Sequence, residues 1–140
     1  YIESALLEID YFYPYLQEEQ YLSHFTLEKA KDEYKVIEVA QTAQIAYGFR
    51  PLIWACLSAF NLTQDDKYMK QAIEISKWFS GENIAAEAMY DPATGRCYDG
   101  IVSPENVNLN SGSESTVEAL LALQMLEKFV DPEKLAGLYD

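Results

Sequence analysis

The chain has 140 residues, a length that fits one domain, and 49% of them are hydrophobic. A chain of this composition can bury a real core, so we expect an ordered domain rather than a disordered one. The formal net charge is −13 at pH 7. Because such a charge repels polyanions and no basic patch offsets it, the sequence predicts neither a nucleic-acid partner nor binding to anionic membrane surfaces.

The sequence contains neither a membrane-spanning segment nor a metal-ligand motif, and these two features guide the predicted location and cofactors. The longest apolar runs, such as Leu52 to Phe60, fall far short of the roughly 20 residues that span a bilayer, and no signal peptide opens the chain, so we expect a cytoplasmic protein. Because the chain begins with Tyr1 and not with Met, it is either processed or a piece of a longer polypeptide, and we interpret it as such a piece. Cys56, Cys97 and His24 form no metal-ligand cluster, so no metal or cofactor is predicted. We expect Cys56 in the core and Cys97 partly exposed in a polar turn.

Apolar residues recur at helical spacing in the first quarter of the chain. From Ile2 the spacing predicts a helix that Pro14 kinks or breaks. Thr26 can cap a second helical stretch, which we expect to continue through Val36 to Tyr47 and to end near Gly48.

The middle of the chain predicts a helical hairpin. Pro51 suits a first helical position, and Leu52 to Phe60 is apolar nearly all round, which indicates a buried helix. Asp65 or Asp66 can cap a second helix, and Gly81 is well placed to end it. Two helices joined by a short turn form the antiparallel unit of helical solenoids and toroids.

Residues 82–112 are rich in Gly, Pro, Asp, Asn, Ser and Tyr, and they predict a long ordered loop. Asp91 to Gly95 is a turn signal, so a small β-hairpin is expected around it. Loops of this length are usually functional or disordered, and the aromatic content argues against disorder. A last helix is expected from Ser113 or Ser115, with Ser115 and Glu118 at capping-box spacing, and Asp131-Pro132 ends it.

Several short motifs in this region appear in a specific order. They are Trp78-Phe79-Ser80-Gly81-Glu82-Asn83, Tyr90-Asp91-Pro92 with Gly95, Cys97-Tyr98-Asp99-Gly100, and Asn108-Leu109-Asn110-Ser111-Gly112-Ser113-Glu114-Ser115-Thr116. Together they resemble a signature of helical domains of the six-hairpin glycosidase-like, or (α/α) toroid, type, over about residues 50–128. Such domains occur behind sugar glycosyltransferase modules. The resemblance implies an all-α fold of antiparallel helical hairpins and carbohydrate-related work.

Two carboxylates are the candidate catalytic residues. A more distant similarity to cellulase-like toroids implies an acid at Glu114, which opens the last helix. If Glu114 faced a cavity, loss of water would raise its pKa and suit it as a general acid, with Asp99 as the second carboxylate. The alternative is structural: Glu114 favours a helix N-terminus, and Asp99 closes an Asp-Gly turn.

Candidate sugar-binding residues lie in or beside the same loop. Tyr90 and Tyr98 can stack on sugars, as can Trp78, although aromatic residues at helical spacing are more often core. Asn108 and Asn110 can bind sugar hydroxyls or hold the loop. Arg96 can pair with Asp91 or Asp99, or bind an anionic sugar.

Taken together, residues 1–140 are interpreted as a single all-α domain that forms the C-terminal part of a larger toroid, with residues 82–112 as a functional loop. The predicted function is sugar binding or part of a glycosidase or glycosyltransferase protein, with enzymatic activity left open. The alternative is a helical scaffold or oligomerisation module without an active site. Predicted partners are a carbohydrate ligand and either a second copy or the rest of the longer chain.

Overall fold

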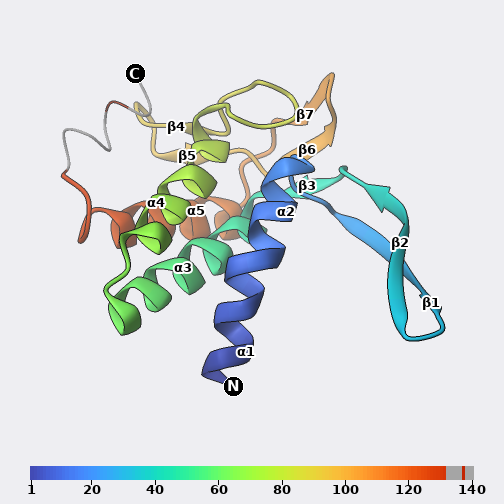
Figure 1. The fold of residues 1–140 in the computed structure, drawn as a ribbon. Helices are drawn as coiled ribbons and strands as arrows, with labels where there is room; N and C mark the ends of the chain where they lie inside the picture. The colour runs from blue at the N-terminus through green and yellow to red at the C-terminus, as the bar shows by residue number, and fades with distance from the viewer. Residues whose placement is uncertain (132–136, 138–140) are drawn as a thin grey trace.

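The computed structural model describes residues 1–131 and 137. Within them, helices combine with three antiparallel β-sheets, so the all-α prediction, with its purely helical hairpins, is wrong. A helical body occupies the centre, short strands gather at the end opposite the N-terminus, and a β-hairpin projects from the body (Figure 1). No helix in the described residues is long and apolar enough to cross a membrane.

The N-terminal helix is interrupted, as the sequence predicts. It consists of α1 (Ile2–Leu7), a π-helical segment η1 (Glu8–Phe12) and α2 (Tyr13–Glu18). Pro14 is the second residue after the π segment, and its ring and missing N–H prevent regular α-helical bonding to the preceding turn. The side-chain amide of Gln71 donates to the Ile9 carbonyl at 3.2 Å, so a neighbouring helix satisfies a carbonyl of the π segment.

The second predicted helix does not form. Its residues build an antiparallel hairpin of β1 (His24–Ala30) and β2 (Glu33–Ala40). The physical reason is the period of the apolar residues: Phe25 and Leu27 alternate with polar residues, and β2 is rich in β-branched side chains, which favour extended backbone. Lys31 has a positive φ of 60°, and this allows the tight turn between the strands.

The central helical hairpin is confirmed. It pairs α3 (Phe49–Thr63) with α4 (Asp66–Ser76), which continues into the 3-10 helix η3 (Lys77–Ser80). The Asp65 side chain accepts from the Lys67 N–H at 3.0 Å and caps α4 as expected. Gly81 ends η3 with a positive φ of 110°, a conformation that glycine adopts without steric cost.

The last helix, α5 (Ser113–Leu126), packs against α3. It begins at Ser113, but the predicted capping box is absent: Gly112 is the N-cap residue, and no side chain caps it. Ser115 is buried, and Glu118 forms an ion pair with Arg50 of α3. Glu118 therefore links α5 to α3 instead of closing its own first turn.

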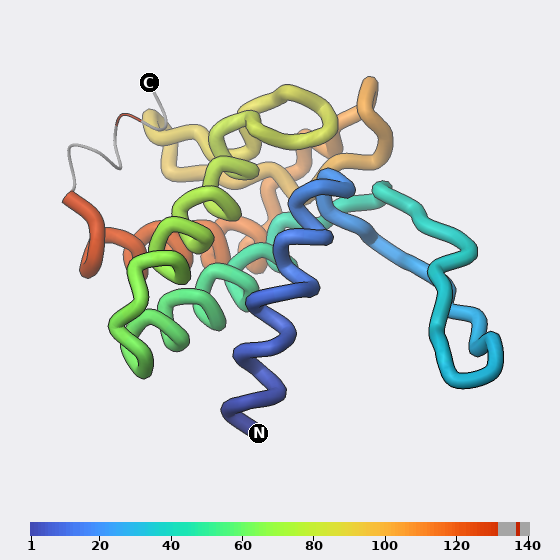
Figure 2. The backbone as a smooth tube through the Cα atoms, viewed as in Figure 1, coloured from blue at the N-terminus to red at the C-terminus, as the bar shows by residue number. Residues whose placement is uncertain are grey.

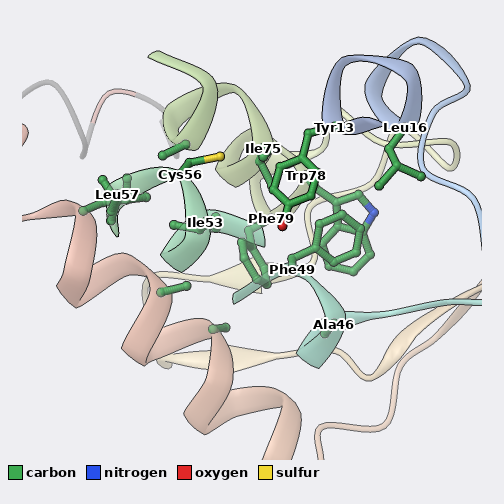
Figure 3. Close-up of a cluster of buried hydrophobic side chains, with 14 of the residues drawn as sticks. Tyr13, Leu16, Ala46, Phe49, Ile53, Cys56, Leu57, Ile75, Trp78 and Phe79 are labelled. Carbon is green, nitrogen blue, oxygen red and sulfur yellow. The ribbon is translucent and has the colours of Figure 1, made fainter. Parts of the chain in front are cut away.

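Aromatic rings from different elements stack in the core (Figure 3). The ring of Phe49 lies on the ring of Trp78, with their centroids 4.0 Å apart and the planes inclined by 17°. Phe79 meets both rings edge-on. Cys56 is buried as predicted, but Cys97 is also completely buried, contrary to expectation. Burial raises the pKa of each thiol to about 12.

Two small sheets hold the residues between η3 and α5. One orders β3 (Gln44–Ile45), β6 (Gly100–Ser103) and β7 (Asn106–Asn108), and the other pairs β4 (Tyr90–Asp91) with β5 (Arg96–Cys97). The short 3-10 helix η2 (Ala46–Gly48) connects β3 to α3. Figure 2 shows this region beside the last helix, on the side of the body away from the N-terminus.

Candidate functional site

The loop predicted to be functional begins with a segment that one asparagine closes. The Asn83 amide nitrogen donates to the carbonyls of Trp78 and Glu87, both at 2.8 Å. Its oxygen accepts from the N–H of Ala85 at 3.1 Å. Because a single side chain joins both ends of residues 82–87 to the end of η3, this part of the loop is held in one conformation.

The predicted β-hairpin follows and is confirmed. Tyr90 pairs with Cys97, and Asp91 pairs with Arg96. The Asp91 carboxylate accepts from the Thr94 hydroxyl at 2.6 Å and from the Ala93 N–H at 2.9 Å. These bonds, the one from Thr94 above all, hold the pKa of Asp91 below its ordinary value. The turn is thus built around an ionised carboxylate.

Asp99 connects three parts of the fold through its main chain and side chain. Its N–H donates to the Asn110 carbonyl at 2.8 Å, and its carbonyl accepts from the Ala46 N–H at 3.0 Å. Its carboxylate accepts from the N–H of Gly112 at 2.7 Å, at the start of α5. A carboxylate that accepts a backbone N–H at this position holds the loop against the helix.

Two adjoining hollows lie on the surface of this loop. One, of about 450 Å³, is lined by Ala85, Glu87, Ala88, Tyr98, Pro104, Glu105, Asn106, Val107 and Leu109. The other, of about 290 Å³, is lined by Ser80, Ala88, Tyr90, Asp91, Pro92 and Tyr98. Tyr98 and Ala88 border both, so the Tyr98 side chain stands where the two hollows meet.

The polar groups around these hollows are acidic or neutral. Glu87 and Glu105 line the larger hollow with the Asn106 amide, and Asp91 lines the smaller one. Among the residues that the structure describes, no lysine or arginine lines either of them. Burial raises the pKa of Tyr90, and the negative charge of Asp91 raises it further. The Tyr90 phenol therefore keeps its proton at neutral pH. The arrangement suits a neutral, hydroxyl-rich ligand better than an anion.

The sequence-predicted sugar-binding residues occupy different positions. Tyr90 and Tyr98 line the hollows. Arg96 is exposed opposite Asp91 in the hairpin, and its charge contributes to the low pKa of that carboxyl. The Asn108 side chain accepts from the N–H of Asn110 at 3.1 Å, which is a turn-forming contact. Asn108 and Asn110 therefore shape the loop, and neither lines a hollow at Tyr98.

The two predicted catalytic carboxylates lie near the same helix end but outside both hollows. Asp99 is half-buried and bonded to Gly112, whereas Glu114, two residues further on, is exposed. Neither lines the hollows beside Tyr98. Trp78 is fully buried under Phe49 and donates its indole N–H to Gln44, so its ring is not available for stacking on a sugar.

Three polar residues of the larger hollow, Glu87, Glu105 and Asn106, did not emerge from the sequence. Only their position within the predicted loop pointed to them. Glu105 lies in the turn between β6 and β7, Asn106 begins β7, and Glu87 precedes β4. Their convergence depends on how two hairpins fold over each other, which local motifs do not encode.

Within the described residues, no group of three or more His, Cys, Asp and Glu side chains could hold a metal ion. No family model matches the chain. A comparison with curated proteins likewise finds no match.

Proposed function

We propose that this domain binds a neutral carbohydrate at the paired hollows of residues 80–109. The observation that carries the proposal is Tyr98, an aromatic side chain that borders both hollows and has carboxylates and an amide around it. A tyrosine ring gives an apolar face for the C–H groups of a sugar ring, while its hydroxyl remains free to bond. Carboxylates and amides are suitable partners for sugar hydroxyls.

The charges favour a neutral ligand over an acidic one. Glu87, Glu105 and Asp91 line the hollows, and the whole chain has a net charge of −13. An anionic sugar would meet repulsion from both. The resemblance of the motifs between Trp78 and Thr116 to those of sugar-related helical domains supports the same ligand class.

The proposed role is binding, and catalysis by Glu114 and Asp99 stays a separate prediction. Asp99 already serves as acceptor for the Gly112 N–H, and Glu114 is exposed. A general acid for glycosidic bonds usually needs an environment that raises its pKa, with a second carboxylate facing the same bond. The binding role makes no such demand of these two side chains.

The cytoplasmic location that accompanies this proposal is supported by the cysteines. Cys56 and Cys97 are both free. Free thiols are typical of reducing compartments, whereas secreted domains of this size often contain disulfides.

Binding can be tested by titrating the isotope-labelled chain with neutral oligosaccharides and following backbone NMR signals. We expect saturable shifts at Tyr98, Asn106 and Glu105, and none with a uronic-acid oligomer of equal length. Asn106→Ala should weaken binding roughly fivefold, the effect of about 1 kcal/mol from one lost hydrogen bond. Asn61→Ala, an exposed change on α3, serves as the matched control.

Tyr98→Ala should abolish binding, and Tyr47→Ala, at an exposed tyrosine outside the loop, should leave it intact. If no neutral glycan shifts the loop signals, or if Tyr47→Ala weakens binding as much as Tyr98→Ala, the proposal fails.

A role in assembly with other chains is the second candidate function, and the exposed apolar side chains of the β1–β2 hairpin favour it.

A further inference from the structure

The two hollows beside Tyr98 are each small. Their volumes are about 450 and 290 Å³, towards the low end of the range of about 300–1,000 Å³ that small-molecule sites occupy. Because Tyr98 and Ala88 border both hollows, a ligand that fills one of them reaches the other at these two residues. The space is therefore a row of two compartments, and its shape suits a ligand built from two linked units.

The border between the hollows is low at Ala88. Its side chain is a single methyl group, and the residue is exposed. The main chain next to it is fixed, because Met89 is completely buried and its N–H donates to the Phe79 carbonyl at 2.9 Å. A ligand can thus pass over Ala88 from one hollow to the other without displacing a side chain.

The backbone on both sides of Tyr98 is also fixed. The Tyr98 N–H donates to the Met89 carbonyl at 2.8 Å, and the N–H of Asp99 donates to the Asn110 carbonyl at 2.8 Å. Cys97, on the other side, is completely buried and pairs with Tyr90. Binding at the half-buried Tyr98 side chain therefore costs little ordering of the backbone.

Hydrogen-bonding groups lie on both sides of this border. Glu105 and Asn106 line the larger hollow, and Ser80 and Asp91 line the smaller one. The Ser80 hydroxyl donates to the Lys77 carbonyl at 3.0 Å, and its oxygen can still accept. Each hollow thus offers its own partners for hydroxyl groups, with the Tyr98 side chain between them.

Exposed residues line both hollows. Pro92 lines the smaller one, and Leu109, which is 66% exposed, lines the larger one. Because these residues face solvent, both hollows are open to it. Further units of a chain-like ligand then have room in the solvent beyond the two hollows.

We propose that the ligand of this site is a chain of at least two linked neutral sugars, with one ring in each hollow and the glycosidic bond above Ala88. This inference rests on the proposed carbohydrate binding and specifies its substrate class. Tyr98, at the border, contacts both rings. A single sugar would occupy one hollow and leave the hydrogen-bonding groups of the other to water.

Titrations of the isotope-labelled full chain with sugars of increasing length test this proposal. The probes are glucose, mannose and galactose, and their linear homo-oligomers of two to four units. We expect a disaccharide to bind roughly tenfold more tightly than its monosaccharide, the effect of one or two added hydrogen bonds, and further units to add less than roughly threefold. The disaccharide should shift the backbone NMR signals of Asp91 and Asn106 together, and the monosaccharide those of one hollow.

Substitutions in the two hollows provide an independent measurement. Asn106→Ala and Ser80→Ala should each weaken disaccharide binding roughly fivefold, and only one of them should weaken monosaccharide binding. Ala88→Leu raises the border, so the gain in affinity from the second sugar should fall below roughly threefold. Ala5→Leu, at an exposed alanine of α1, is the matched control and should keep the full gain.

Failure of this inference is distinguishable from failure of carbohydrate binding itself. Equal affinities for a monosaccharide and its disaccharide, or an undiminished gain in Ala88→Leu, would overturn the inference while carbohydrate binding stands. No binding of any probe would overturn both. Dispersed NMR spectra confirm that each variant is folded.

Discussion

The indole N–H of Trp78 donates to the side-chain oxygen of Gln44 at 2.6 Å inside the core. The Gln44 amide nitrogen donates in turn to the carbonyls of Gln20 and Tyr21, at 2.6 and 2.9 Å. Gln44 is only 4% exposed, and its side chain satisfies the buried indole N–H of Trp78 in η3 and two carbonyls of the turn after α2. One buried amide thus joins the N-terminal helix, β3 and the helical hairpin.

Gln44→Ala removes all three bonds and leaves the buried Trp78 N–H and two part-buried carbonyls without this partner. We expect a loss of about 2–4 kcal/mol in the free energy of unfolding, since each unsatisfied buried group costs about 1–3 kcal/mol. Urea unfolding followed by tryptophan fluorescence measures it. Gln124→Ala, at an exposed glutamine within α5, should change stability far less. Equal effects of the two changes would contradict the role of Gln44.

Gly100 lies so close to β3 that a side chain does not fit. A Cβ atom there would lie 2.2 Å from the Gln44 carbonyl oxygen. We expect Gly100→Ala to cost about 1–3 kcal/mol or more, because the strands must separate to relieve the overlap. At Gly48 no atom lies within 4 Å of an added Cβ. Gly48→Ala is therefore the matched control, and thermal unfolding of both variants should separate them clearly.

Asp99 and Glu114 should differ in their effect on stability. Asp99→Ala leaves the Gly112 N–H without its acceptor, and we expect a loss of about 1–3 kcal/mol. Glu114→Ala removes only an exposed carboxylate near a helix N-terminus, worth less than about 1 kcal/mol. Chemical denaturation measures both. A Glu114→Ala variant as unstable as Asp99→Ala would show that Glu114 holds the loop too.

Asp91 predicts a pH dependence of stability. The Thr94 hydroxyl and the Ala93 N–H lower its pKa in the folded state. A lowered folded-state pKa means that the carboxylate stabilises the fold above its ordinary pKa, and that this stabilisation disappears as the pH falls through the folded-state value. Asp91→Asn should therefore be less stable than the wild type at pH 7, and the difference should shrink below about pH 4.

Urea midpoints measured at a series of pH values give this difference directly. Thr94→Val removes the main cause of the shift, so the pKa of Asp91, followed by NMR, should rise towards its ordinary value. Ser111→Ala, which removes another hydroxyl of the same loop, is the control. A stability difference that stays constant from pH 7 to pH 3 would contradict the prediction.

The sequence by itself determined the elements whose signals are local. The α3–α4 hairpin follows from an apolar helix, the Asp65 cap and Gly81, all within 33 residues of chain. The kink at Pro14 and the β-turn at Asp91 likewise depend on atoms a few residues apart. Such features form from near neighbours, because capping and turn bonds need little help from the rest of the fold.

Only the tertiary structure decided the remaining features. Residues 24–40 carry both helical and strand signals over short runs, and pairing with each other selected the strands. Trp78 is a core residue because Phe49 and Gln44, far away in sequence, enclose it. Tyr98 lines two hollows because the β4–β5 and β6–β7 hairpins converge beside it. These outcomes depend on contacts between distant segments, which a local pattern of residues does not contain.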